Sequence, residues 1–144
     1  MVEMSDTGTF VVVPATNVTV AALDEFLAPF IAVERLLPRT HDELDELARN
    51  GFVALSGDAI VGFAALEIYS SKLAEVRSLA VDPRFQRHGI GKTLVQACID
   101  RAREKRVFEI MAVTSSDDFF RRCGFDFTLP GEKKALFLQT REKY

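Results

Sequence analysis

The sequence predicts an α/β protein in which a single mixed β-sheet of about six to seven strands is flanked by about four helices. Short runs typical of strands alternate with segments whose apolar residues recur at helical spacing. Between Leu73 and Lys105, an apolar run leads through a glycine-containing turn into a helical pattern. The 144 residues, uninterrupted by any linker or repeat, are a one-domain length, so we expect one domain over residues 1–144.

Composition narrows the class of function. The chain is 48% hydrophobic and 27% charged, as in an ordinary soluble globular protein, and no apolar run approaches the roughly 18 residues that span a bilayer. A net charge of −3 argues against nucleic acid as a partner. The two cysteines have neither metal-type spacing nor a disulfide pattern, and no signal-peptide pattern is present. We therefore expect a cytoplasmic protein without metal, membrane or nucleic-acid partners.

The first third of the chain predicts one strand and two helices. Phe10 to Val13 is a short β-type run, and apolar residues then recur at helical intervals over roughly Val18 to Glu34. Pro38 ends this pattern, because proline disfavours helix in the residue before it. Thr40, with Glu43 three places later, has the pattern of a capping box and predicts a second helix to about Arg49.

The remaining elements alternate between strands and helices. One strand, Val107 to Val113, is apolar at nearly every residue, which predicts burial on both faces. In chain order we expect strands Phe52–Leu55, Ala59–Tyr69 and Ala74–Val81, a helix from Ile90 to about Ala102, strand Val107–Val113, helix Asp117–Arg122, and strands Phe125–Leu129 and Lys134–Gln139.

The turn from Val81 to Lys92 has the parts of an anion site. The first turn of a helix leaves backbone N–H groups unpartnered and carries partial positive charge. Gly89 and Gly91 have no Cβ, so a phosphate could approach the main chain closely. The segment from Arg84 to Arg106 holds seven bases and two acids, which also favours an anionic cofactor. We expect a phosphorylated cofactor at this turn.

Spacing selects among phosphate-binding motifs. Gly91-Lys92-Thr93 resembles the end of a Walker A loop, but Gln86 stands where that loop needs its first glycine. The dinucleotide pattern fails because Leu94 stands where a third glycine is expected. Gln86-Arg87-His88-Gly89-Ile90-Gly91 instead fits Gln-x-x-Gly-x-Gly, which resembles the acetyl-CoA loop of the GNAT superfamily of N-acetyltransferases. The order of elements and the later segment Asp118 to Phe125 resemble the same family.

This resemblance implies a GNAT fold whose sheet splays open between the fourth and fifth strands to hold acetyl-CoA. A narrower resemblance, to the acetyltransferase domain of N-acetylglutamate synthase, rests on the strings Leu36–Thr40, Ala74–Val81 and Asp118–Phe120. Homodimers are common in the family, so the resemblance makes a homodimer one candidate assembly of this chain. The resemblance implies that the cofactor is held by Leu79, Ala80, Val81, Gln86, Arg87, His88, Gly89, Ile90, Gly91, Lys92 and Phe120.

The resemblance also implies direct attack of an amine on the thioester. Glu75 is the candidate general base. The alternative is that Glu75 is an ordinary surface carboxylate paired with Arg77. Alternation places Glu75, Arg77 and Leu79 on one face of their strand unless a β-bulge intervenes. Many family members carry a tyrosine that protonates the thiolate where this chain has Phe120. Thr114, Ser115 or Ser116 are the candidate donors here, or the thiolate leaves unassisted.

The acceptor is expected to be a small primary amine, with an amino acid such as glutamate as the first choice. Its α-carboxylate needs a cation, and Arg39 and Arg77 are the candidates, each with an ordinary surface arginine as the alternative. The resemblance places acceptor walls in loops such as Glu34–Thr40 and Ser70–Leu73. Two alternatives stay open: acetylation of a peptide N-terminus or another small amine, and a CoA-binding sensor that has lost catalysis, for which Phe120 is the hint.

Overall fold

The computed structural model describes residues 9–142 and shows one five-stranded mixed sheet with helices on both faces. Its strands lie in the order β1-β2-β3-β4-β5; the first four pair antiparallel and β5 pairs parallel to β4. The predicted mixed α/β class is confirmed. The strands are β1 (Val11–Pro14), β2 (Gly51–Ser56), β3 (Ala59–Ile68), β4 (Leu73–Val81) and β5 (Glu109–Met111).

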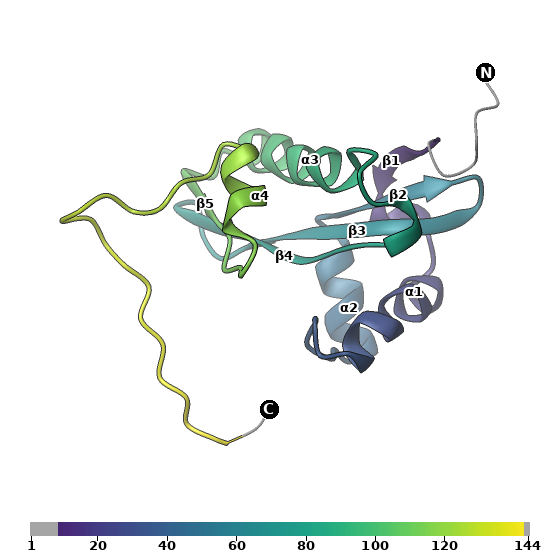
Figure 1. Cartoon of the computed structure of the whole chain (residues 1–144), viewed down its shortest axis with the longest axis horizontal. Helices are drawn as coiled ribbons and strands as arrows, with labels where there is room; N and C mark the ends of the chain where they lie inside the picture. The colour runs from purple at the N-terminus through teal and green to yellow at the C-terminus, as the bar shows by residue number, and fades with distance from the viewer. Residues whose placement is uncertain (1–8, 143–144) are drawn as a thin grey trace.

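Two helices cover each face of the sheet (Figure 1). On one face lie α1 (Val20–Ala32) and α2 (His41–Ala48), and on the other α3 (Ile90–Glu104) and α4 (Asp117–Arg122). Short 3₁₀ turns, η2 (Ala15–Asn17) and η3 (Pro83–Phe85), precede α1 and α3. The core is therefore double, one layer against each sheet face. The α1–α2 layer includes Leu23, Leu27, Leu47, Phe63 and Ala80, and the α3 layer includes Leu66, Val76, Ile90, Leu94 and Cys98.

The helix starts follow local chemistry. The Thr40 hydroxyl accepts a hydrogen bond from the Glu43 backbone N–H at 3.1 Å, and the Glu43 carboxylate accepts one from the Thr40 N–H at 2.8 Å. The predicted capping box at α2 is thus confirmed. Thr19 caps α1 in the simpler way, accepting from the Ala22 N–H at 3.0 Å. Both caps satisfy backbone donors that a helix start leaves free.

A β-bulge interrupts β4. Phe63 of β3 pairs with Ala80, but Ala65 pairs with Arg77, so two residues of β4 oppose one of β3. The extra residue is accommodated by Ser78, whose φ is +59°. Past the bulge the faces exchange: Ala80 packs in the α1–α2 layer and Leu79 against the α3 layer. The face that simple alternation gives Leu79 is therefore wrong, and the exception made for a β-bulge applies, since alternation ends at Ser78.

The strand β5 is shorter than predicted. It covers only Glu109–Met111 rather than Val107–Val113, and Glu109 is exposed while Ile110 and Met111 are half-buried. The prediction of burial on both faces is wrong because β5 lies at the edge of the sheet. Phe108 and Val113, the apolar residues that suggested burial, are 84% and 58% exposed.

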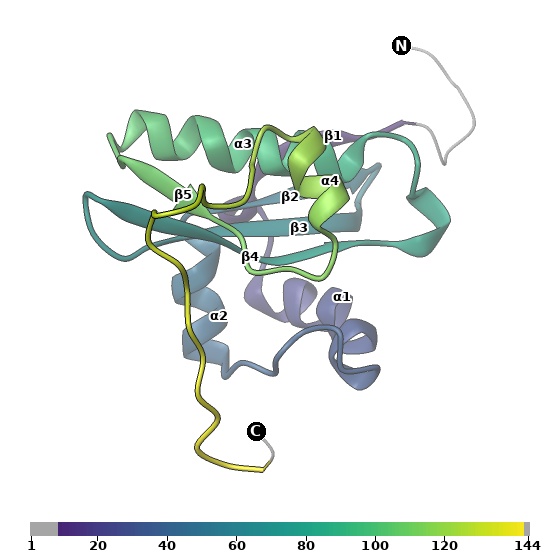
Figure 2. The same cartoon turned by 60° about the vertical axis from the view of Figure 1, so that its left-hand side comes forward.

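The two predicted C-terminal strands are absent among the described residues, so five strands are found rather than six to seven. Residues 125–142 leave α4 and run away from the sheet toward the α2 side (Figures 1 and 2). Leu136 and Leu138 are 90% and 87% exposed. Their apolar, β-type composition predicted strands, but a strand forms only against a paired neighbour, and these residues have none.

None of the helices within residues 9–142 combines the length and the apolar character that crossing a bilayer requires. Residues 1–8 and 143–144, which belong to the expected single domain, lie outside the described part of the chain.

Candidate functional site

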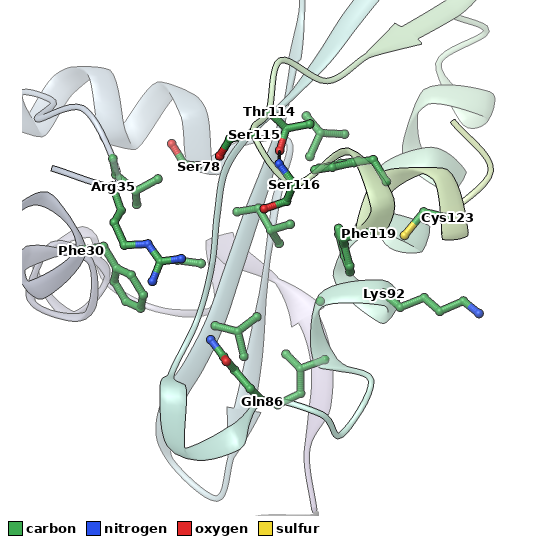
Figure 3. Close-up of a pocket in the computed structure, with 18 of the residues that line it drawn as sticks. Phe30, Arg35, Ser78, Gln86, Lys92, Thr114, Ser115, Ser116, Phe119 and Cys123 are labelled. Carbon is green, nitrogen blue, oxygen red and sulfur yellow. Dashed lines mark hydrogen bonds between the residues drawn. The ribbon is translucent and has the colours of Figure 1, made fainter. Parts of the chain in front are cut away.

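A cavity of about 1010 Å³ opens where β4 and β5 part (Figure 3). The two strands pair only from Leu73↔Glu109 to Glu75↔Met111. Beyond Glu75 the edge of β4 that faces β5 has no strand partner, and the bulge segment from Ser78 to Val81 lines the cavity. The opposite wall comes from the loop after β5 and from α4. The predicted splay between the fourth and fifth strands is therefore present.

The turn into α3 forms one end of the cavity. Gly89 is the N-cap of α3 and has a φ of +82°, a conformation that glycine adopts without strain. Within the described chain, the backbone N–H groups of Gly89, Ile90 and Gly91 donate no hydrogen bond, while the Gly89 carbonyl accepts from the Thr93 N–H at 3.0 Å. These free donors sit at the positive end of a 15-residue helix. The geometry suits a phosphate group.

The charge of this end is positive. Arg87, Lys92 and Arg122 line the cavity. Among the described residues of its lining, Glu34 is the one acid, and it belongs to the segment after α1. A diphosphate would therefore meet cations and free amides at the α3 end.

The two glycines of the turn serve different purposes. A Cβ built on Gly89 meets no atom within 4 Å, so the space beside it is open to a ligand. A Cβ on Gly91 would lie 3.2 Å from Cζ of Phe119, whose ring belongs to α4. Gly91 thus allows α4 to pack against the start of α3, and this packing joins two walls of the cavity.

Most of the residues expected to hold the cofactor line this cavity, and His88 does not. Four residues that were not singled out also line it at this end, namely Phe85, Phe119, Arg122 and Cys123. Phe119 belongs to the segment Asp118 to Phe125 that resembles the family, and its place beside Phe120 was the available signal. The predicted residues that line the cavity are Leu79, Ala80, Val81, Gln86, Arg87, Gly89, Ile90, Gly91, Lys92 and Phe120.

The candidate proton donors also reach the cavity. Thr114 and Ser115 line it together with Ser116, in the loop between β5 and α4 (Figure 3). The Thr114 hydroxyl accepts a hydrogen bond from the Ser116 backbone N–H at 2.8 Å, which fixes this loop. The hydroxyls therefore lie on the β5 side of the gap, opposite the β4 bulge.

Glu75 and Arg77 lie in a separate polar cluster. Glu75 is only 8% exposed, and its Oε1 accepts a hydrogen bond from the Tyr69 hydroxyl at 2.6 Å. The Arg77 Nη1 lies 3.7 Å from the same oxygen and donates to Glu67 Oε1 at 2.9 Å. Burial raises the pKa of Tyr69, and its hydrogen bond to the Glu75 carboxylate adds to the effect. Neither Glu75 nor Arg77 is among the described cavity-lining residues, and the roles expected of both stay predictions.

Arg39 lies beside the other end of the cavity. It lines a small pocket of about 10 Å³, with room for about one water, together with Asp24 and Ser78. Its Nε is buried and has no hydrogen-bond partner in the described structure. Leu36 and Ser78 line both this pocket and the large cavity, so the small pocket adjoins the cavity at the bulge.

The segment after α1 completes the site. Phe30, Glu34, Arg35 and Leu36 line the cavity, whereas the loop Ser70–Leu73 does not. The resemblance places an acceptor wall in Glu34–Thr40, and Arg39 is the one residue that the sequence analysis names within it. Within residues 9–142, no group of three or more His, Cys, Asp or Glu residues is arranged to hold a metal ion.

A sheet that parts beside a helix start with free backbone amides offers a phosphate-bearing ligand a place between two strands. The sequence model of the acetyltransferase (GNAT) family matches residues 20–125, and the chain belongs to this family. An uncharacterized N-acetyltransferase of Chlorobaculum tepidum is 37% identical over 90 residues, which are 62% of this chain and 58% of that protein. An amino-acid acetyltransferase of Mycobacterium tuberculosis is 38% identical over 66 residues, which are 46% of this chain and 38% of that protein.

These two matches cover less than two thirds of the relatives' own lengths. Among solved structures, a Mycobacterium tuberculosis protein in complex with CoA and NLQ superposes with a TM-score of 0.74 and 29% identity over 87% of this chain and 76% of that one. N-acetylglutamate synthase from Neisseria gonorrhoeae, with CoA and N-acetyl-glutamate, gives a TM-score of 0.70 and 22% identity over 79% of this chain and 27% of that one, a likeness of fold. The family and these CoA complexes make acetyl-CoA the expected cosubstrate, and the free amides and cations at the α3 end fit its diphosphate.

Proposed function

We propose that this protein transfers an acetyl group from acetyl-CoA to the primary amine of a small molecule, and that the acceptor is an amino acid such as glutamate. The supporting observation is that one cavity runs from the amide-rich turn of α3, through the gap between β4 and β5, to the segment after α1. The gap would deliver the thioester to an amine bound at the α1 end. The named activities of the two relatives agree with this reaction class.

The chain's own groups would position the cosubstrate. Amides and cations of the Gln86–Lys92 turn would hold the diphosphate, and the unpartnered edge of β4 around Leu79 to Val81 would hold the pantetheine arm. Acetyl-CoA itself supplies an activated acyl group. Backbone N–H groups aimed at the developing oxyanion are commonly worth about 3–4 kcal/mol, and alignment of the two reactants supplies much of the rest.

Proton transfer would use both sides of the gap. Glu75, which the structure keeps apart from the cavity lining, would accept the amine proton through a water rather than directly. Thr114 or Ser115 would donate a proton to the departing thiolate, since Phe120 cannot. A thiol with a pKa of about 8.5 also leaves tolerably without assistance.

The acceptor would be held by arginine. Arg39 is the first candidate for the α-carboxylate, because its Nε is buried without a partner beside Ser78. A buried donor left unpaired is costly, and a carboxylate bound in the cavity beside Ser78 would satisfy it through the one water for which the small pocket has room. Arg77 is the second candidate, although Glu67 and Glu75 already neutralise it.

A thiol-release assay with acetyl-CoA and a panel of L-amino acids, peptides and diamines tests the proposal. We expect release of CoA that depends on an amino acid, with the acetyl group on the α-nitrogen by mass spectrometry. Release only with peptides or with diamines would replace the amino acid by that acceptor class. CoA binding without release for any acceptor would favour a sensor. A cytoplasmic location and a homodimer belong to the same proposal, and light scattering checks the latter.

A further inference from the structure

Arg35 occupies a fixed position at the acceptor end of the cavity. The helix α1 ends in a Schellman motif: the Arg35 N–H donates to the Phe30 carbonyl at 2.9 Å, and the Glu34 N–H donates to the Ile31 carbonyl at 2.9 Å. Glu34 takes the left-handed position, with a φ of +59°. These two hydrogen bonds fix the backbone from which the Arg35 side chain leaves, even though the side chain itself is exposed.

The Arg35 guanidinium points from this loop into the cavity, above Phe30 and toward β4 (Figure 3). Lys92, at the diphosphate end, lies on the opposite side of the cavity in the same view. Arg35 is therefore a cation of the acceptor end rather than of the phosphate-binding turn.

Two arginines at this end are left without an ionic partner. Among the described residues Arg35 forms no ion pair, not even with the neighbouring Glu34. Arg39 also forms none, although Asp24 lines the same small pocket, and its Nε is an orphan donor. Ser78 connects the two, because it lines the cavity with Arg35 and the small pocket with Arg39.

Arg35 and Arg39 line different pockets, so a carboxylate held by Arg39 leaves the Arg35 guanidinium available for a second anion. A neutral amino acid would satisfy Arg39 through its α-carboxylate and leave Arg35 without a partner. We propose that Arg35 is a specificity-determining residue that binds a second anionic group on the acceptor, so that the site selects amino acids with an anionic side chain. The inference rests on the proposed function for the acceptor class, and adds Arg35 and the requirement for a second anion.

Binding, rather than turnover, tests this most directly. Isothermal titration of the protein saturated with CoA would compare L-glutamate with L-glutamine, which has nearly the same shape but lacks the side-chain charge. We expect the wild-type protein to prefer L-glutamate, and Arg35→Gln to reduce its affinity by roughly 10- to 100-fold while changing that of L-glutamine little. Arg35→Lys should retain part of the preference, because it keeps the charge but loses the planar fork.

Two further variants separate Arg35 from its surroundings. Arg39→Gln should weaken both ligands together, because both carry the α-carboxylate. Arg49→Gln, which changes an exposed arginine of the C-cap of α2 outside both pockets, should weaken neither. CoA affinity, measured separately, should be the same in Arg35→Gln as in the wild type.

Equal affinity of the wild type for the two ligands would overturn the inference, as would an equal loss of both in Arg35→Gln or a loss of CoA binding in that variant. A preference for L-glutamate that depends on Arg35, in a protein that releases no CoA from acetyl-CoA, would support the inference and contradict the proposed catalysis. Catalysis with neutral amino acids alone would support the proposed catalysis and contradict the inference.

Discussion

At the scale of single residues, the site depends on backbone positions more than on reactive side chains. Gly89 holds a left-handed conformation at the start of α3, and the space beside it is empty of protein atoms. Ser78 holds a left-handed conformation without being glycine, at the bulge that turns β4 toward the cavity. Such strained positions persist only where the surrounding structure fixes them, and they gather at functional sites.

Gly89→Ala should weaken CoA binding more than it weakens the fold. The added Cβ meets no protein atom, so its costs are the strained φ, about 1–2 kcal/mol, and the loss of space for a phosphate. Titration with CoA measures the loss of binding, and urea unfolding measures the loss of stability. Gly57→Ala is the matched control: Gly57 also has a positive φ, +61°, and open space, but it lies in the β2–β3 turn. Equal CoA affinities in the two variants would remove Gly89 from the cofactor site.

Glu75→Gln should lower kcat by about 100-fold or more if Glu75 accepts the amine proton, and should leave CoA affinity unchanged. Glu67→Gln is the control, because Glu67 contacts Arg77 from the other side of the same cluster. A similar loss in both variants would mean that the Tyr69–Glu75–Arg77 cluster serves the fold rather than the proton transfer.

Most of the residues that the sequence analysis assigned to the cofactor line the cavity, and the signal for the turn among them is local. The spacing from Gln86 to Gly91 marks the glycine turn that forms one end of the cavity, and ten of the residues expected to hold the cofactor line the cavity as a whole. Arg35 was missed because its position depends on Glu34 in a left-handed conformation, which no residue preference suggests. The face predicted for Leu79 was wrong for a similar reason, because Ser78 also takes a left-handed conformation that its residue type does not suggest. A bulge is a property of two paired strands and cannot be read from one.

At the scale of elements, the helices begin and end by short-range rules. The capping box of α2 and the bounds of α4 were predicted because each depends on residues three to five apart. The helix α4 ends in a Schellman motif with Gly124 at φ +101° and with the rings of Phe120 and Phe125 5.3 Å apart. A C-terminal strand, by contrast, would form only against the edge of a strand distant in sequence, and the composition of residues 125–139 does not indicate whether such an edge is available.

The end of α3 tests whether a Schellman motif is most stable with glycine at its left-handed position. Arg106 stands at the left-handed position of a Schellman motif, with φ +59°, and the Val107 N–H donates to the Ala102 carbonyl at 2.9 Å. Because a non-glycine residue is strained there, Arg106→Gly should raise the free energy of unfolding by roughly 0.5–1 kcal/mol. Gly124→Ala should lower it by a similar amount. Urea unfolding measures both, and a destabilising Arg106→Gly would show that the arginine side chain contributes more than the strain costs.

At the scale of the whole molecule, the cavity lies between a large unit and a small one. The strands β1 to β4 form a continuous antiparallel sheet, whereas β5 joins it through only three residue pairs. The loop after β5 and α4 continue from this short ladder and form the far wall of the cavity. A ligand that contacts both walls would therefore hold the small unit against the large one.

We expect acetyl-CoA to slow hydrogen exchange in two separate segments at once, the β4 bulge around Ser78 to Val81 and the wall around Val113 to Ser116. In the free protein the second segment should exchange faster than β2 and β3, because a short edge ladder opens at lower free energy than a central one. Binding adds its own free energy to that opening. Mass spectrometry of deuterated peptides measures both segments, with β1, at the opposite edge of the sheet, as the internal control. Protection confined to the α3 turn would show that the ligand binds by its phosphates alone and does not enter the gap between β4 and β5.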